Sequence, residues 1–287
     1  MENENLISQG WPAPAKLNLF LHIVGRREDG YHLLQTVFQF IDYCDTLDFE
    51  TSGNKRITLS GNSTEHPLQD DLIYRAATLL QAETGCNKGS RIHVEKKIPL
   101  GAGLGGGSSN AATTLVALNH LWQLGLEREQ LAALGLQLGA DVPIFVHGHA
   151  AFAEGVGEQL TSIDPDEPWY LLIFPGCRVA TAAIFGATDL TRNTPPITIR
   201  DFLKDGGHND CEAPARLLYP EVAAALDWLQ TCANARMTGT GSCVFASFND
   251  RSEAESVCRN IPAKWQGIVT RGTNQSPLMA RLGQANQ

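Results

Sequence analysis

Apolar and polar side chains alternate strictly near the start of the chain. Aliphatic residues occupy every second position from Ala15 to Ile23, and polar residues such as Lys16 and Asn18 lie between them. A period of two with aliphatic residues on one side is typical of a β-strand that buries one face. We therefore expect a half-buried strand over residues 13–24, with Lys16 and Asn18 together on its other face.

The rest of the pattern mixes short strands with helices. Asp29-Gly30 is a turn signal that leads the chain from the first strand into a second. Apolar runs predict later strands at residues 36–41, 46–50, 57–60, 91–96, 150–153, 169–174 and 243–246. Helical spacing, with glycines near several ends, predicts helices at residues 70–83, 110–124, 126–138, 179–187 and 221–233. Strands that come first, followed by a mixture of strands and helices, predict an α+β protein of two lobes.

The most informative segment joins an expected strand to an expected helix. Five glycines fall between Gly101 and Gly107, and an apolar helix follows at once. Glycine adopts positive φ and has no Cβ, so an anion can approach the backbone amides of such a loop. We expect Ser108, Ser109 and Asn110 to cap the helix, whose N-terminus carries a partial positive charge. Loop and helix start together predict a binding site for the phosphates of a nucleotide.

Three common phosphate-binding motifs fit this segment poorly. The P-loop requires a lysine where Gly107 stands. The dinucleotide-binding pattern G-x-G-x-x-G matches from Gly101 to Gly106, but no second strand fits before Glu127, where an acidic ribose ligand would be needed. The protein-kinase loop would need VAIK, HRD and DFG motifs further on, and none follows. A flexible linker is also disfavoured, because apolar segments flank the glycines on both sides.

Composition restricts the partners and the compartment. The 287 residues carry a formal net charge of −9, which argues against a nucleic-acid partner but not against a local phosphate site. No apolar run approaches the ~20 residues of a membrane span, and the N-terminus lacks the features of a signal peptide. Seven scattered cysteines without C-x-x-C spacing predict free thiols rather than disulfides or a metal site. We expect a cytoplasmic protein without a membrane partner or a protein-bound metal.

Further motifs flank the glycine segment along the chain. Pro-Ala-Lys-Leu-Asn occupies residues 14–18, Asp141 lies within Gly-Ala-Asp-Val-Pro, and a second glycine turn occupies residues 238–242. The glycine segment itself, residues 99–109, matches Pro-x-Gly-x-Gly-Leu-Gly-x-x-Ser-Ser with one extra glycine. In this order the motifs resemble those of the small-molecule kinases named for galactose, homoserine, mevalonate and phosphomevalonate (GHMP kinases). The resemblance covers residues 11–280.

The resemblance implies a fold and an activity. It implies an N-terminal lobe similar to ribosomal protein S5 at residues 1–160, a C-terminal α+β lobe at residues 161–287, and an active site in the cleft between them. Asp-Gly-Tyr-His at residues 29–32 adds a resemblance to the branch that serves the non-mevalonate isoprenoid pathway. That branch uses ATP with Mg²⁺ to phosphorylate the 2-hydroxyl group of a small molecule, a cytidine diphosphate derivative of a methylated tetritol.

The resemblance assigns the chemistry to Asp141 and Lys16. Asp141 matches the catalytic aspartate of the family, and a carboxylate within reach of an alcohol can accept or orient the hydroxyl proton. A lysine beside it can keep that carboxylate ionised, lower the pKa of the attacking hydroxyl and neutralise charge on the γ-phosphate. Asp141 as a general base and Asp141 as an electrostatic anchor both stay open. From the pattern alone, Asp141 would be a turn-capping residue and Lys16 a strand-surface lysine.

The resemblance also assigns the binding residues. The triphosphate of ATP is assigned to a loop formed by Pro99, Leu100, Gly101, Ala102, Gly103, Leu104, Gly105, Gly106, Gly107, Ser108 and Ser109. Tyr31 and His32 are assigned to the pyrimidine, Phe185 to a second aromatic face and Asn18 to the substrate, although Tyr31 could instead pack within the hairpin. The turn at residues 239–242 would approach the substrate or the phosphate loop, or be purely structural. No acidic metal ligand is evident, so Mg²⁺ would be held mainly by ATP and water.

Other functions stay open beside this one. Another GHMP kinase, acting on homoserine or mevalonate, would share the loop but lack the Lys16 and Tyr31-His32 pattern. A GHMP-fold decarboxylase or a nucleotide-binding protein without catalysis is disfavoured by the presence of both Lys16 and Asp141. An NAD-dependent oxidoreductase would need the dinucleotide-binding arrangement that the segment lacks. The sequence does not indicate an oligomeric state.

Overall fold

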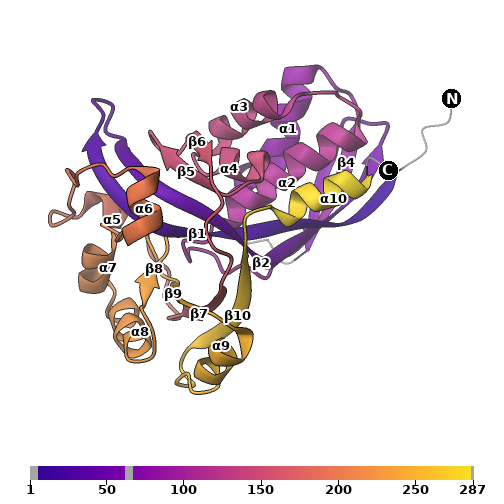
Figure 1. The fold of residues 1–287 in the computed structure, drawn as a ribbon. Helices are drawn as coiled ribbons and strands as arrows, with labels where there is room; N and C mark the ends of the chain where they lie inside the picture. Colours follow the sequence, from indigo (N-terminus) through magenta and orange to yellow (C-terminus); the bar gives the residue numbers. More distant parts are fainter. Residues whose placement is uncertain (1–5, 62–66, 286–287) are drawn as a thin grey trace.

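The computed structural model describes residues 6–61 and 67–285, which form two lobes joined along one sheet (Figure 1). The strands are β1 (Ile7–Arg26), β2 (His32–Ser52), β3 (Ile57–Gly61), β4 (Gly89–Glu95), β5 (Ala151–Glu154), β6 (Gln159–Ser162), β7 (Trp169–Phe174), β8 (Arg236–Met237), β9 (Val244–Phe248) and β10 (Gln266–Thr273). The helices are α1 (Leu72–Thr84), α2 (Gly106–Leu121), α3 (Arg128–Leu138), α4 (Val142–His147), α5 (Thr181–Gly186), α6 (Ile199–Asp205), α7 (Glu212–Leu218), α8 (Pro220–Gln230), α9 (Arg251–Cys258) and α10 (Pro277–Ala285), with a 3₁₀ turn at Leu68–Asp70. Across these described residues, no helix combines the length and the apolar character that a bilayer span requires.

The sheet links the two lobes through β10. One path through it runs β3-β4-β2-β10-β7-β9-β8, and β1 and β5 also pair with β2. β10 pairs with β7 over most of its length, and only its last two residues, Gly272 and Thr273, pair with β2. The predicted α+β class is confirmed, with helices and mainly antiparallel strands in both lobes.

The longest elements are the antiparallel strands β1 and β2, which cross both lobes (Figure 1). The prediction of separate strands at residues 36–41 and 46–50 is wrong, because β2 is continuous. Polar residues lie between the two expected strands. One of these, Asp45, is fully buried, and its carboxylate accepts hydrogen bonds from the amides of Lys97 and Ile98 at 2.7 and 2.8 Å. A buried carboxylate with these partners can lie within a strand.

Strand β1 is buried on both faces, so the prediction of a half-buried strand is wrong. Lys16 and Asn18, expected on the open face, are only 3% and 4% exposed. The glycine loop and the C-terminal lobe lie over this face, as the bonds from Lys16 to Gly103 and from Asn18 to Thr238 show. Tertiary contacts therefore bury polar residues that the local pattern placed in solvent.

The N-terminal core lies between the sheet and helices α1 to α4 and α10, which cover one face of it (Figure 1). Its largest fully buried members include Trp11, Phe40 and Phe145. Leu278 of α10 belongs to the same core, although it lies near the end of the chain. Helix α10 therefore packs in the N-terminal lobe, against the core to which β1 also contributes.

The C-terminal core lies between β7, β9 and the helices α5, α7, α8 and α9. Leu21 and Ile23 of β1 are part of it, so the first strand contributes to both cores. The division of the chain at residues 160 and 161 stays a prediction, since β1 and α10 each cross it in space.

Candidate active site

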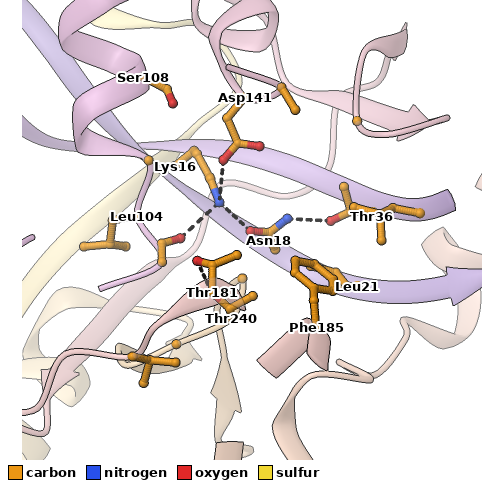
Figure 2. A pocket seen from close by; sticks show the side chains of 18 of the residues that line it. Lys16, Asn18, Leu21, Thr36, Leu104, Ser108, Asp141, Thr181, Phe185 and Thr240 are labelled. Carbon is orange, nitrogen blue, oxygen red and sulfur yellow. Dashed lines mark hydrogen bonds and ion pairs between the residues drawn. The ribbon is translucent and has the colours of Figure 1, made fainter. Parts of the chain in front are cut away.

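A cavity of about 930 Å³ lies between the lobes. Its walls include β1, the turn at residues 29–32, the loop at residues 98–108, the second glycine turn at residues 239–241 and helix α5 with Phe185 (Figure 2). Every residue that the sequence assigned to the site lines this cavity except Ser109. Motifs that are far apart along the chain therefore converge on one site.

The glycine loop presents backbone amides to the cavity. Gly101, Gly103 and Gly105 have φ values of +68°, +75° and +73°, in the left-handed region that favours glycine. Gly105 is the N-cap residue of α2, and no side chain caps this end of the helix. The first amides of a helix have no acceptor within the helix, so those of Gly106 and Gly107 are available to an anion.

The predicted capping residues of this helix are wrong. The helix begins at Gly106, so Ser108, Ser109 and Asn110 lie inside its first turns instead of before it. Ser108 lines the cavity, whereas Ser109 is fully buried and does not. The assignment of Ser109 to the phosphate site stays a prediction; its amide donates to Gly105 O at 2.9 Å, within the first turn of the helix.

A buried ionic cluster fixes the start of α2 to the segment after β4. Lys96 forms an ion pair with Asp45, and its Nζ also donates to Asn110 Oδ1 at 2.7 Å. Asn110 Nδ2 donates to Asp45 Oδ2 at 3.0 Å, while Asp45 Oδ1 accepts the amides of Lys97 and Ile98. The glycine loop is thus anchored at both of its ends by one carboxylate.

Lys16 and Asp141 meet inside the cavity (Figure 2). Lys16 Nζ lies 3.6 Å from Asp141 Oδ2, and it donates to Asn18 Oδ1 at 2.5 Å and to Gly103 O at 3.0 Å. Burial lowers the pKa of Lys16, and the Asp141 carboxylate opposes this lowering. Asp141 is the N-cap residue of α4, and its side chain is 37% exposed. A carboxylate open to the cavity and a buried ammonium therefore stand together beside the glycine loop.

The second glycine turn packs directly on the first loop. Ser242 N donates to Gly101 O at 3.2 Å. A Cβ on Gly103 would lie 2.3 Å from Thr238 O, so the two backbones touch where no side chain would fit. Residues 239–241 also line the cavity. Of the roles that the sequence left open, this geometry supports the approach to the phosphate loop.

Aromatic side chains line a second region of the cavity. The rings of His32 and Phe185 stack with centroids 4.9 Å apart and planes 20° apart. His32 therefore covers one face of Phe185, and both residues line the cavity. Tyr31 is 64% exposed, and its amide donates to Asp29 Oδ1 at 3.2 Å. The exposed Tyr31 ring is not a packing residue of the hairpin.

Arg192 is a residue of this region that the sequence did not reveal. Its Nε donates to His32 Nε2 at 3.2 Å, and its Nη2 donates to Phe185 O at 3.0 Å. The segment at residues 192–196 reads as a surface connection, and Arg192 lies 160 residues from His32 along the chain. No short-range pattern could have signalled this pair.

Comparisons with known proteins agree with this geometry. Family models described as "GHMP kinases N terminal domain" and "GHMP kinases C terminal" match residues 71–149 and 190–267. A protein of Nitrosococcus oceani named 4-diphosphocytidyl-2-C-methyl-D-erythritol kinase is 57% identical over 269 residues, which are 94% of this chain and 96% of the relative. The chain belongs to the 4-diphosphocytidyl-2-C-methyl-D-erythritol kinase family of GHMP kinases.

Two further matches carry the same family name. A protein of Shewanella pealeana named 4-diphosphocytidyl-2-C-methyl-D-erythritol kinase is 52% identical over 279 residues, 97% of this chain and 98% of the relative. A crystal structure of 4-(cytidine 5'-diphospho)-2C-methyl-D-erythritol kinase matches with a TM-score of 0.79 and 33% identity, covering 93% of this chain and 99% of that one. The predicted family, the two-lobed fold class and the ATP-dependent small-molecule kinase activity are thereby confirmed. The oxidoreductase alternative is wrong.

The site of this GHMP kinase has the parts that phosphoryl transfer needs. Such a reaction depends mainly on positioning and on stabilising negative charge. Bare amides at the start of α2 suit a triphosphate, the Lys16 ammonium suits the charge that develops during transfer, and the Asp141 carboxylate suits an acceptor alcohol. All three lie in one cavity that the two lobes enclose together.

Proposed function

We propose that this chain transfers the terminal phosphoryl group of ATP to the 2-hydroxyl group of 4-diphosphocytidyl-2-C-methyl-D-erythritol. The products are the 2-phosphate and ADP, in the non-mevalonate isoprenoid pathway. Two relatives at 57% and 52% identity over nearly the whole chain are named as this kinase. The observation that carries the mechanism is the distance of 3.6 Å between Lys16 Nζ and Asp141 Oδ2, in a cavity shared with the glycine loop.

The triphosphate is proposed to lie along residues 99–108. The amides at the start of α2 are fixed donors that need no rearrangement when an anion arrives. Glycine is required here, because a Cβ on Gly105 would lie 2.8 Å from Phe145 Cζ and 3.2 Å from Lys16 Cε. The residues present therefore fit a polyanion that contacts the backbone directly.

Asp141 is proposed to hold the acceptor alcohol. A hydroxyl that donates to its carboxylate directs an oxygen lone pair toward the terminal phosphorus. As the new P–O bond forms and the bond to ADP breaks, the hydroxyl proton passes to Asp141 or leaves after transfer. The first course is the general-base role and the second is the electrostatic role. In both, Lys16 stabilises the negative charge on the transferred group.

Asn18 is proposed to orient Lys16 as well as to contact the substrate. Its Oδ1 accepts from Lys16 Nζ at 2.5 Å, and its Nδ2 donates to Thr36 Oγ1 at 2.9 Å. Both polar ends of the Asn18 amide are therefore fixed by hydrogen bonds, and Asn18 in turn orients the Lys16 ammonium from the same face of β1. Asn18 also lines the cavity, so the predicted contact with substrate belongs to this proposal.

Mg²⁺ is proposed to arrive with ATP. Among residues 6–61 and 67–285, no group of three or more His, Cys, Asp or Glu side chains could hold a metal ion. The Ser108 hydroxyl and the Asp141 carboxylate are oxygen donors in the same cavity. This donor set fits a cation that keeps most of its contacts to phosphate and water. When bound, Mg²⁺ neutralises charge on the phosphates.

The cytidine is proposed to bind at Tyr31, His32 and Phe185. The aromatic rings of Phe185 and of the exposed Tyr31 line the cavity and suit stacking, and the His32 ring offers polar atoms. Stacking of a base on an aromatic ring contributes about 1–3 kcal/mol. The region therefore suits a pyrimidine attached to the small acceptor through a diphosphate.

The setting of the reaction is proposed to be the cytoplasm, with small molecules as the partners. All seven cysteines are free thiols, as expected for a reducing compartment. The net charge of −9 disfavours a nucleic-acid partner. The phosphates of small ligands are met instead by local amides and by Lys16.

An ADP-release assay tests the proposed function. The acceptor is 4-diphosphocytidyl-2-C-methyl-D-erythritol, and CDP, homoserine and mevalonate are the controls. We expect ADP release with the first acceptor alone and a product whose ³¹P NMR spectrum places the new phosphate on the 2-hydroxyl group. Comparable release with homoserine or mevalonate, or phosphorylation at another hydroxyl, would refute the assignment.

A further inference from the structure

Arg192 connects the two aromatic residues of the proposed base site. Its Nε donates to His32 Nε2 at 3.2 Å. Its Nη2 donates to the carbonyl oxygens of Phe185 and Ala187 at 3.0 and 2.7 Å, and its Nη1 donates to Leu190 O at 3.0 Å. One guanidinium therefore ties the His32 ring to the C-terminal end of helix α5.

The segment that carries Arg192 is itself held firmly. Thr194 N donates to Ile23 O at 3.0 Å, and Thr194 Oγ1 donates to Asp210 Oδ2 at 2.7 Å. The same carboxylate oxygen accepts the amide of Ile23 at 2.7 Å, and Asp210 is only 7% exposed. Arg192 thus stands two residues from a point anchored on β1. It does not line the cavity, so it acts on a ligand only through its neighbours.

The chemistry of the guanidinium decides the protonation of His32. Arginine has donors and no acceptor, so the nitrogen that receives its N–H must carry a lone pair. His32 Nε2 is therefore unprotonated, and a neutral ring then carries its hydrogen on Nδ1. Burial and the nearby charges of Arg192 and Arg26 lower the pKa of His32, which favours the neutral ring.

We propose that Arg192 is a positioning residue that fixes His32 in its Nδ1–H tautomer and holds the ring stacked on Phe185, so that the base site offers an N–H donor. The proposal rests on the proposed function for the identity of the base. Cytosine presents two acceptors, N3 and O2, on its pairing edge, and an N–H donor matches them. Without Arg192 the ring could exchange tautomers, and the Nε2–H form would present the Nδ1 lone pair to these acceptors.

The tautomer is tested directly by ¹⁵N NMR of the full chain labelled at histidine. The chain has eight histidines, so His32→Gln assigns the His32 signals by difference. We expect a pyridine-like Nε2 and a pyrrole-like Nδ1 in the unsubstituted protein, and a loss of this preference in Arg192→Met. A pyrrole-like Nε2 in the unsubstituted protein, or the same spectrum in both, would overturn the proposal.

Kinetics test the consequence for binding. We expect Arg192→Met to raise KM for 4-diphosphocytidyl-2-C-methyl-D-erythritol by roughly tenfold, the effect of one lost hydrogen bond, with kcat and KM for ATP within twofold. Arg192→Lys keeps a donor for His32 but loses the hydrogen bonds from the guanidinium to the carbonyl oxygens at the end of α5. Compared with Arg192→Met, it should therefore recover the tautomer and part of the affinity for the substrate. Arg200→Met, an exposed arginine on α6, is the matched control and should change nothing.

A double variant separates positioning from general damage. If Arg192 acts through His32, Arg192→Met should add less than twofold to the KM of His32→Gln. Additive losses, or a fall in kcat equal to the rise in KM, would show a merely structural role and overturn the proposal. If the unsubstituted protein failed to use the cytidylyl substrate at all, the proposed function would fail while the tautomer measurement would still decide the role of Arg192.

Discussion

The substitution Gly103→Ala tests whether close contact between the glycine loop and the second glycine turn is needed for stability. Gly103 has φ of +75°, and a Cβ there would lie 2.3 Å from Thr238 O and 3.0 Å from Gly241 O. Both neighbours are backbone atoms, so neither can rotate out of the way. Left-handed backbone costs a residue with a Cβ about 1–2 kcal/mol, and forced overpacking adds about 1–3 kcal/mol. We expect Gly103→Ala to lower the free energy of unfolding by about 2–5 kcal/mol.

Gly101 provides a matched control in the same loop. Its φ of +68° is nearly the same, but the nearest atom to an added Cβ is Arg178 Cβ at 3.5 Å, an ordinary contact. Gly101→Ala should therefore show the backbone strain alone, about 1–2 kcal/mol. Differential scanning calorimetry of the two variants measures the difference, and Tm changes by about 2–4 °C per kcal/mol in a chain of roughly this size. The Gly103 variant should melt several degrees below the Gly101 variant.

The same pair of variants reports on ATP binding. Because Gly103 carries the carbonyl that accepts from Lys16 Nζ at 3.0 Å, a displaced loop moves both the amides and the ammonium. We expect the folded Gly103 variant to show a higher KM for ATP than the Gly101 variant at a temperature below both transitions. Equal melting temperatures, or equal KM values for ATP, would refute the claim that contact between the turns holds the loop.

Three further substitutions probe other parts of the site. Asp141→Asn keeps the shape and removes the charge, so kcat should fall by about 10²–10⁴ while ATP titrations stay nearly unchanged; unaltered turnover would remove Asp141 from the mechanism. Tyr31→Ala should raise KM for the cytidylyl substrate far more than KM for ATP, since one stack contributes about 1–3 kcal/mol; equal rises would point to a damaged fold. Asp45→Asn replaces the buried carboxylate beside the Lys96 ammonium with a neutral amide and should lower the free energy of unfolding in urea by about 3–5 kcal/mol; a loss near zero would show that the cluster does not anchor the loop.

Local motifs made most of the site predictable. The glycine loop is a contiguous run with a stated physical use, and the spacing of Lys16 and Asn18 follows from the period of a strand. The pairing of Lys16 with Asp141 came from the family resemblance, because no local rule brings residues so far apart to within 3.6 Å. The long-range contact is what turns two ordinary side chains into a reactive pair.

The errors arose where tertiary contacts overrule local patterns. Two strands were expected where β2 is continuous, and backbone amides from a distant loop satisfy the Asp45 carboxylate within it. Serines that are good capping residues lie within α2, because Gly105 reaches a left-handed conformation and starts the helix sooner. Arg192 carried no signal, since its partner His32 belongs to the opposite part of the chain.

The return of α10 to the N-terminal lobe has a consequence for synthesis on the ribosome. Leu278 is completely buried in the first core, yet it is made long after the other buried residues of that core. The N-terminal core of the nascent chain therefore stays incomplete, with apolar side chains exposed, until α10 has left the ribosome. A chain truncated before α10 would lack contacts in the N-terminal core rather than in the C-terminal one. We expect quality-control proteases to cleave such a chain in its N-terminal lobe.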